Sequence, residues 1–119
     1  MNRYDIQKRT MKMALEVIKL TKLFPNCHES KVISYQIIKC STSTAANYRA
    51  AGRAKSARDF IAKLCIVEEE CDETLFWLDF SVEAKIISLD QIQTVRKETS
   101  EILAMIVSSI KTARKNLNS

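Results

Sequence analysis

Apolar residues recur every three or four positions along nearly the whole chain, which is the spacing of helices that bury one face. The first such stretch covers residues 4–23, and Val17 and Leu20 widen its apolar stripe. We expect its core face to be formed by the residues spaced at i, i+3, i+4 and i+7, which are Met11, Ala14, Leu15 and Ile18. Pro25 and Asn26 then interrupt the pattern, because proline cannot continue a helix and asparagine favours turns.

A second helix is expected from Ser30 to Ala51, followed by the single glycine of the chain, Gly52. Its apolar positions are Ile33, Ile37, Cys40, Thr44, Ala45 and Tyr48. Glycine accepts a left-handed backbone at low cost, so we expect Gly52 to end the helix in that conformation. The small residues 41–46 would let a neighbouring helix approach closely. Asn47 is unfavourable inside a helix unless its amide finds partners, and we expect it to bond across to the third helix or the adjoining loop.

Two longer helices follow, each opened by the spacing of a capping box. Ser56 and Asp59 open the third helix, and Ser88 and Gln91 open the fourth. The apolar stripe of the third helix consists of Ala57, Phe60, Leu64, Val67, Cys71, Leu75, Leu78 and Val82. The stripe of the fourth helix consists of Ile92, Val95, Thr99, Ile102, Ile106, Ile110, Ala113 and Leu117, broadened by Leu103 and Val107.

Four amphipathic helices with short loops predict an all-α, antiparallel up-down-up-down four-helix bundle. The 119 residues include one glycine, one proline and 46% hydrophobic residues, so we expect a single domain over residues 1–119 with its own core. No apolar run approaches the roughly 20 residues that cross a membrane. The charged, amphipathic N-terminus also lacks the apolar core of a secretory signal. We therefore expect a cytoplasmic protein with no membrane association.

The residues that usually carry catalysis or bind metal are few. The four cysteines contain no Cys-x-x-Cys pair, and the single histidine, His28, lacks metal-ligand spacing. Cys27 lies next to His28, but no orienting acid or companion motif accompanies them. We expect the thiols to be reduced and to pack as small hydrophobic groups. Without a nucleotide-binding glycine loop, we expect no cofactor, no metal and no enzymatic activity.

Charge is unevenly distributed, although the net charge is only +5. Residues 49–63 hold five basic side chains and one acid, whereas residues 64–84 hold seven acids and no base. In an up-down bundle, the turn between the second and third helices lies at the same end as the start of the first helix and the end of the fourth. Basic side chains at these three places are our candidates for nucleic-acid binding: Arg49, Arg53, Lys55, Arg58, Lys63, Arg9, Lys12, Arg114 and Lys115.

Three roles remain open for these cations. Arg53, Lys55 and Arg58 flank the start of a helix, where the helix dipole favours acids. A phosphate backbone would offset this placement, and so would an acidic surface on the same or a neighbouring subunit. Alternatively, the cations are simply solvated. Aromatic residues off the main stripe of the third helix favour a subunit interface, for which the candidates are Phe76, Trp77, Phe80, Glu69 and Glu73.

One block of the sequence resembles a known family. It reads STAANYRAA from residue 43, RAKS from residue 53, DFI from residue 59 and KL from residue 63, followed by Glu69, Glu73-Thr74 and Trp77-Leu78. This block is similar to the bacterial four-helix-bundle family that includes the 23S ribosomal RNA intervening-sequence proteins. That family is related to the accessory variability determinant of diversity-generating retroelements. The resemblance covers nearly the whole chain.

The resemblance implies a small cytoplasmic bundle that assembles into a homo-oligomeric ring of five subunits, with a basic surface suited to DNA or RNA. In the retroelement relatives, the ring partners a reverse transcriptase. Our main hypothesis is a non-enzymatic, oligomeric accessory protein that binds the backbone of nucleic acid. The alternative is a structural adaptor for a protein partner such as a reverse transcriptase, with the basic residues used in subunit pairing.

Overall fold

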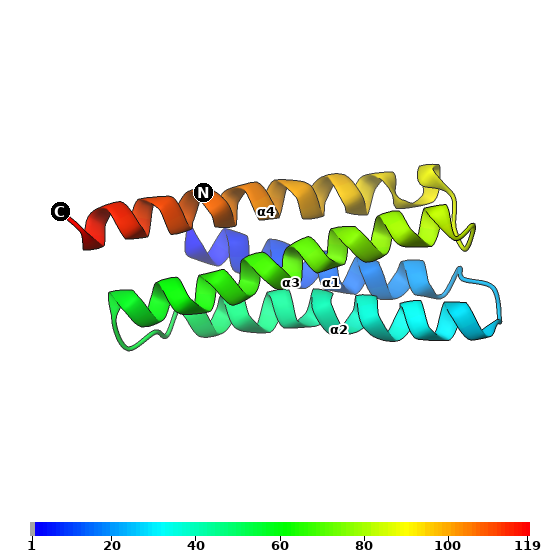
Figure 1. Ribbon diagram of the computed structural model, residues 1–119, viewed down its shortest axis with the longest axis horizontal. Coiled ribbons are helices and arrows are strands. Elements are labelled where there is room, and N and C mark those ends of the chain that lie inside the picture. Colours follow the sequence, from blue (N-terminus) through cyan, green and yellow to red (C-terminus); the bar gives the residue numbers. More distant parts are fainter. Residues whose placement is uncertain (1) are drawn as a thin grey trace.

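Residues 2–119 are described by a computed structural model, and they form an elongated bundle of four helices (Figure 1). In chain order the helices are α1 (Arg3–Thr21), α2 (His28–Ala51), α3 (Ala57–Glu83) and α4 (Leu89–Leu117). The bundle measures 51 × 22 × 21 Å. Each helix packs on the next helix along the chain, and α4 returns to α1. The predicted up-down-up-down architecture is therefore confirmed.

Side-chain caps fix the starts of the two long helices. At the start of α4, Ser88 Oγ accepts the N–H of Gln91 at 3.2 Å, and Gln91 Oε1 accepts the N–H of Ser88 at 3.0 Å. The predicted capping box therefore forms. At the start of α3, Ser56 Oγ accepts the N–H of Asp59 at 3.1 Å. The Asp59 carboxylate instead accepts the N–H of Lys55 at 3.0 Å, so only half of the predicted capping box forms.

Gly52 ends α2, but its backbone is not left-handed as expected. Its φ is −64°, which any residue can adopt. The close approach of Arg3 explains the glycine better, because Arg3 Nη1 donates to the carbonyl oxygen of Gly52 at 3.0 Å. A Cβ at residue 52 would lie 3.1 Å from Arg3 Cδ and crowd this contact. The left-handed residue is Lys85, whose φ is 60°, in the turn between α3 and α4.

The core face of α1 differs from the expected one. Met11 and Leu15 are 52% and 54% exposed, so the prediction that they face the core is wrong. The buried residues of α1 are Ile6, Thr10, Met13, Ala14, Val17 and Leu20. Two apolar stripes therefore run along this helix, and the one containing Met11 and Leu15 faces outward. In α4 the buried residues all belong to the predicted stripe, and they are Ile92, Val95, Thr99, Ile102, Ile106 and Ile110.

The core face of α3 is also displaced from the prediction. Phe60, Leu75 and Val82 are only half-buried and Ala57 is exposed. Small polar residues take part of the buried face, which consists of Ile61, Leu64, Val67, Cys71, Thr74, Leu78 and Ser81. Their hydroxyls are satisfied within the helix, since Thr74 Oγ1 lies 2.9 Å from the Glu70 carbonyl oxygen and Ser81 Oγ lies 2.7 Å from that of Leu78. Because each hydroxyl has an acceptor, its burial carries little penalty.

The interior of the bundle holds two thiols. Cys40 Sγ on α2 lies 3.2 Å from Thr74 Oγ1 on α3, and Cys71 Sγ on α3 lies 3.5 Å from the carbonyl oxygen of Thr99 on α4. Burial raises the pKa of Cys40 to about 11 and that of Cys71 to about 12. Both thiols therefore stay protonated near neutral pH and pack as small apolar groups.

Asn47 does not bridge to another element, so the prediction of a cross-helix anchor is wrong. Its Nδ2 donates to the carbonyl oxygen and to the Oγ of Ser43, each at 2.9 Å. Both partners lie one turn earlier in α2. The amide therefore finds its acceptors locally, which is the other way in which asparagine is tolerated inside a helix.

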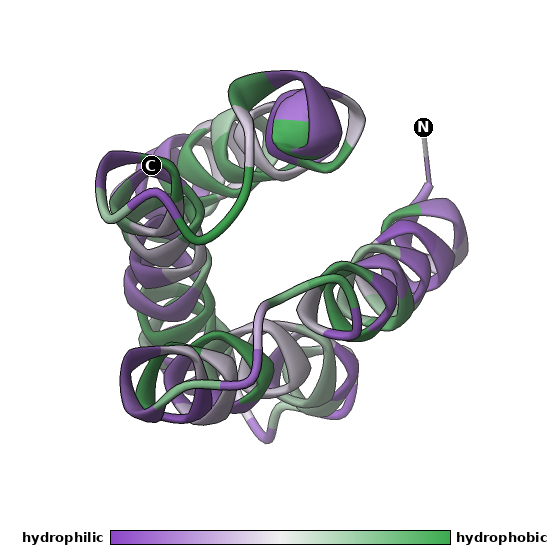
Figure 2. Ribbon diagram, turned by 90° about the vertical axis from the view of Figure 1, so that its right-hand side faces the viewer, coloured by the Kyte–Doolittle hydropathy of each residue, from purple (hydrophilic) through white to green (hydrophobic). Residues whose placement is uncertain are grey.

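The bundle is not equally tight on all sides. In the view along its axis, the helix that starts at the N-terminus is set apart from α4 (Figure 2). The contact between α1 and α4 is the smallest of the four contacts between helices, and that between α2 and α3 is the largest. Helix lengths add to the difference, because α1 has 19 residues and α4 has 29. At the end where the chain terminates, α4 extends beyond the start of α1 (Figure 1).

Candidate nucleic-acid interface

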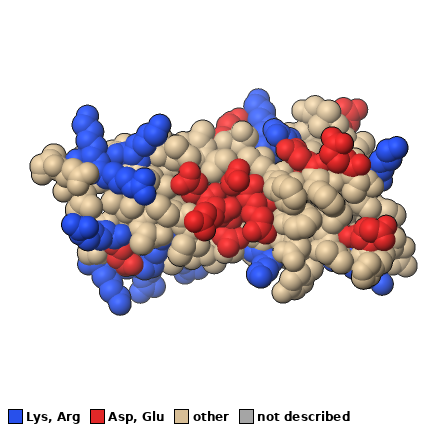
Figure 3. Space-filling view, viewed as in Figure 1, with Lys and Arg blue, Asp and Glu red and all other residues tan. Residues whose placement is uncertain are grey.

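Cations gather at the end of the bundle where α2 passes into α3 and α4 ends (Figure 3). We call this surface the basic end and define it by Arg53, Lys55, Arg58, Arg114 and Lys115, all of which are exposed. Up-down topology places the turn between α2 and α3 beside the last turns of α4. The contact between Arg114 Nη2 and Cys65 Sγ, at 3.6 Å, shows the two helices meeting there. The start of α1 lies at the same end of the long axis, through the bond from Arg3 to Gly52.

The cations of the basic end are exposed and lack ion-pair partners within residues 2–119. In the part of the chain that the structure describes, none of the five forms an ion pair with a carboxylate. Asp59 is the one acid of residues 49–63. Its Oδ1 lies 2.7 Å from Lys63 Nζ, with which it forms an ion pair. That contact, together with the N–H of Lys55, lowers the pKa of the Asp59 carboxyl. The basic end therefore presents concentrated positive charge to solvent.

A polar hollow lies on α4 near the basic end. It has a volume of about 320 Å³ and is lined by Phe60, Ser108, Ser109, Thr112, Ala113 and Asn116. It exists because α1 begins too late to cover this side of the last turns of α4 (Figure 1). Hydroxyl and amide groups can donate to phosphate and sugar oxygens. Hydrogen-bond donors and cations are thus available together at this end.

Two of the predicted cations instead form ion pairs with carboxylates of the same chain. Arg9 Nε donates to Glu98 Oε2 at 2.8 Å and its Nη2 contacts both Glu98 and Glu101, which joins α1 to α4. Lys63 is held by Asp59, one turn earlier in α3. Two others lie elsewhere on the surface, since Lys12 lines a groove between α1 and α4 and Arg49 lines a groove between α1 and α2. The structure therefore brings together five of the nine predicted cations.

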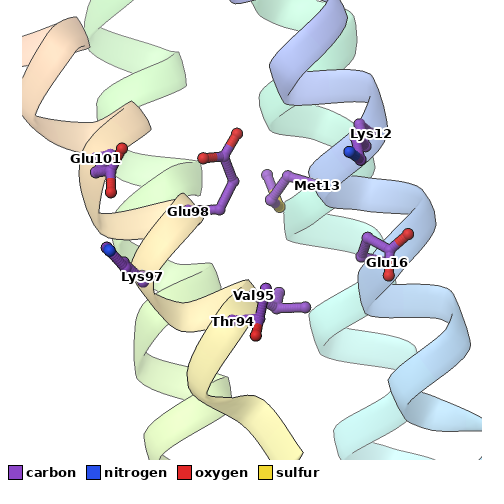
Figure 4. A pocket seen from close by; sticks show the side chains of 8 residues that line it. All are labelled: Lys12, Met13, Glu16, Thr94, Val95, Lys97, Glu98 and Glu101. Atoms are coloured by element: carbon purple, nitrogen blue, oxygen red, sulfur yellow. The ribbon is translucent and has the colours of Figure 1, made fainter.

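The groove between α1 and α4 has a volume of about 640 Å³ and mixed charge. Glu98 projects from α4 toward Met13 on α1 across this groove, with Lys12 and Glu16 on the α1 side and Lys97 on the α4 side (Figure 4). Hydrogen bonds from Arg9 lower the pKa of the Glu98 carboxyl. Both walls carry acids as well as bases, so this groove does not suit a polyanion.

Aromatic residues form an outward-facing ridge on α3, as the sequence suggested. Phe76 is 53% and Phe80 is 44% exposed, and their ring centroids are 5.7 Å apart. Trp77 is half-buried against both rings, and its Nε1 donates to Glu73 Oε2 at 3.2 Å. Glu69, one turn before Glu73, is also exposed. We define the aromatic ridge by these five residues, and a group of acids lies over the middle of α3 (Figure 3).

A second apolar surface was missed by the sequence analysis. The outer groove lies between α1 and α2 and has a volume of about 350 Å³. Its lining combines the outward stripe of α1 with small residues of α2, and consists of Gln7, Met11, Ala14, Leu15, Ile18, Thr42, Ala45, Ala46 and Arg49. The sequence did contain the signal, because α1 has more apolar positions than one buried face can use.

Two further classes of site are absent from residues 2–119. No helix there is long and apolar enough to cross a membrane. Within the same residues, no group of three or more histidine, cysteine, aspartate or glutamate side chains is placed to hold a metal ion.

Comparison with known proteins identifies the family. The chain is similar to the crystal structure of a protein of unknown function from the S23 ribosomal protein family of Bacteroides thetaiotaomicron, with 32% sequence identity and a TM-score of 0.82. That match covers 89% of this chain and 98% of the other. The comparison with curated proteins gives no match. The model of the family described as 23S rRNA-intervening sequence protein matches residues 2–108, so the chain belongs to this family.

Proposed function

We propose that this protein is a non-enzymatic, homo-oligomeric accessory protein that binds nucleic acid by its backbone through the basic end. The observation that carries the proposal is a set of five cations at one end of the bundle that have no carboxylate partner among residues 2–119, whereas some of the other cations are paired. Arginine can grip a phosphate with two parallel hydrogen bonds, and lysine adds a point charge. The polar hollow supplies donors for the sugar and phosphate oxygens between such contacts.

The chemistry of the surface favours contact with the backbone over reading of bases. Sequence is read by side chains that enter a groove and meet base edges, usually from a helix or a strand pair presented to the duplex. At the basic end, the cations lie on a turn and on two helix ends. We therefore expect affinity to depend strongly on salt and weakly on sequence.

The non-enzymatic part of the proposal rests on the state of the reactive groups. Cys40 and Cys71 are buried thiols with raised pKa values, which makes them poor nucleophiles. Glu98 and Asp59, whose pKa values are lowered, act in ion pairs with Arg9 and Lys63. The homo-oligomeric part rests on exposed apolar side chains on two separate faces, the aromatic ridge and the outer groove.

Fluorescence anisotropy with labelled oligonucleotides tests the proposal directly. The probes are a single-stranded RNA, a single-stranded DNA and a DNA duplex, each in two unrelated sequences. We expect binding at about 50 mM salt that weakens steeply toward about 200 mM, with a slope of roughly 0.9 log units per phosphate contact for the duplex. The two sequences of each probe should bind with similar affinity. Absence of binding to every probe at about 50 mM salt would overturn the proposal.

A further inference from the structure

The aromatic ridge and the outer groove are two exposed apolar surfaces, one projecting and one concave. The ridge raises two exposed phenylalanine rings above α3, whereas the outer groove is open and lined mainly by apolar side chains. Its lining includes Ala45 and Ala46, whose small side chains leave room for a ring. Neither surface is covered by another part of the described chain. Two exposed apolar surfaces on one small protein suggest a heterologous contact, in which one surface of each copy meets the other surface of the next.

The charges around the two surfaces are opposite in sign. Arg49 lines the groove, and helical spacing places Lys8 and Lys22 beside it, because each lies three, four or seven residues from one of its lining residues on α1. In the described chain, none of these three exposed cations has an ion-pair partner. The ridge carries Glu69 and Glu73 on the same face as its rings, and residues 64–84 hold no base. Opposite fields of this kind orient two copies and disfavour pairing of like surfaces.

The two surfaces also lie at the same height along the bundle. Arg3 meets Gly52 across α1 and α2, and Thr74 meets Cys40 across α3 and α2. Leu15 lies twelve residues after Arg3, and Cys40 lies twelve residues before Gly52. Because antiparallel helices advance equally per residue, Leu15, Cys40 and Thr74 share one height.

Phe76 lies two residues beyond Thr74, which is about 3 Å further along the axis. Copies packed side by side without axial displacement therefore place Phe76 of one copy opposite Leu15 of the next. A heterologous contact that repeats without displacement along its axis can close into a ring, whereas one with displacement builds a filament.

We propose that the aromatic ridge of one copy docks in the outer groove of the next copy, with Glu69 and Glu73 facing Lys8 and Arg49. This inference rests on the proposed function in one respect, the homo-oligomeric state. It assigns Arg49 to the subunit contact and leaves nucleic acid to the basic end. Because every copy points the same way in such an assembly, all basic ends lie on one face. Several copies then contact one strand, which raises the apparent affinity through effective concentration.

The test uses two variants of the full chain, each of which removes one surface. The groove variant carries Met11→Asp and Leu15→Asp, and the ridge variant carries Phe76→Asp and Phe80→Asp. All four positions are exposed, so both variants should retain the helical circular dichroism of the wild type. Light scattering should give an oligomer for the wild type and the 13.6 kDa monomer for each variant alone. A matched control, Leu89→Asp, changes an equally exposed leucine away from both surfaces and should keep the wild-type mass.

Mixing the two variants separates the proposal from its alternatives. Each mixture partner keeps one intact surface, so an equimolar mixture should form a heterodimer of about twice the monomer mass and nothing larger. A monomeric wild type would overturn the proposal, and so would a groove variant that still self-associates through its ridge. A mixture that stays monomeric would overturn it as well.

A second set of variants keeps the test decisive if the aspartates unfold the bundle. Lys8→Glu with Arg49→Glu, and Glu69→Lys with Glu73→Lys, should each lower the mass alone and associate when mixed. Association that does not return on mixing counts against the contact. The masses do not depend on nucleic acid, so failure of oligonucleotide binding would leave this inference standing while removing the basic-end proposal.

Discussion

In the middle of the bundle a cation meets carboxylates, whereas at the basic end the cations meet solvent. Arg9 bridges α1 and α4 through Glu98 and Glu101, at the side of the bundle where helix contact is smallest. Within residues 2–119, Arg53 and Arg58 have no such partner, although the seven acids of residues 64–84 follow them closely in sequence. The same residue type therefore stabilises the fold in one region and stays available to an external anion in the other.

The difference follows from geometry more than from composition. Arg9 lies between two helices whose side chains converge, so its guanidinium reaches acids on the opposite helix. The cations of the basic end project from a turn and from helix ends, where no carboxylate of residues 2–119 forms an ion pair with them. An arginine at a helix N-terminus is also mildly unfavourable because of the helix dipole. Such a placement costs the bundle stability and gains it nothing internally, which is the pattern expected of a binding surface.

The contrast between Arg9 and the basic end would fail most clearly if substitutions in the basic end left oligonucleotide binding unchanged. Arg53→Glu with Arg58→Glu should weaken oligonucleotide binding roughly 100-fold at low salt, because two charge-assisted contacts are lost. Thermal unfolding should hardly change, since neither side chain holds an ion pair. The matched control is Lys85→Glu with Lys97→Glu, which changes the net charge equally at exposed positions outside the basic end. Equal losses in both variants would show that only net charge matters.

The opposite result is expected for the cation in the middle. Arg9→Gln should lower the free energy of unfolding by about 1 kcal/mol and the melting temperature by about 4 °C. The half-exposed site reduces the effect below that of a buried pair. Oligonucleotide affinity, measured by anisotropy on the folded protein, should stay within about twofold. Lys97→Gln removes an exposed cation of the same groove and serves as the control. A large loss of binding in Arg9→Gln would move Arg9 to the interface.

Lowering the pH should weaken the contribution of the Arg9–Glu98 ion pair to the free energy of unfolding. The pKa of Glu98 is lowered in the folded protein from its ordinary value of 4.5, so its stabilising contribution is present above that value. The contribution is lost as the pH falls through the lowered folded-state pKa. Urea unfolding of the wild type and Arg9→Gln at several pH values should therefore give a difference in free energy that narrows below about pH 4. A difference that grows in acid would contradict the assignment.

The smallest effect is expected for a cation that is near the basic end but already paired. Lys63→Gln should change oligonucleotide affinity less than twofold, because Asp59 holds Lys63 Nζ at 2.7 Å. Lys115→Gln, which removes an unpaired cation, should weaken binding more and lower the salt slope by about one contact. Anisotropy over the same salt series measures both. Equal effects of the two variants would mean that pairing within the chain does not decide which cations bind.

Much of the fold could be predicted because local rules and the fold agree in most elements. Ser88 with Gln91 set the start of α4 as their spacing predicted, and Pro25 lies between α1 and α2. The face of α1 was the main error, and it has a physical cause. Periodicity identifies an apolar face but does not say what covers it. The stripe with Met11 and Leu15 and the stripe with Met13 therefore both fitted a core face, and only the second is buried.

The candidate site was only partly predictable. Topology alone placed Arg53 and Arg114 at one end, since an up-down bundle has no other way to arrange its turns. Sequence could not show that Arg9 finds partners, because Glu98 lies 89 residues away in the chain. It also could not show that Asn47 bonds within its own helix, because local and cross-helix acceptors satisfy an amide equally well.

The buried thiols of Cys40 and Cys71 can report transient opening of the bundle. Cys40 and Cys71 become reactive toward thiol reagents only when the helices around them separate, whereas Cys27 and Cys65 are half-buried in the folded chain. The rate at which Cys40 and Cys71 are modified thus measures how often the core opens. Cys65 lies against Arg114, so a dye attached there lies beside the proposed nucleic-acid surface. The native cysteines therefore report two events separately: Cys40 and Cys71 report opening of the core, and Cys65 reports binding at the surface beside Arg114.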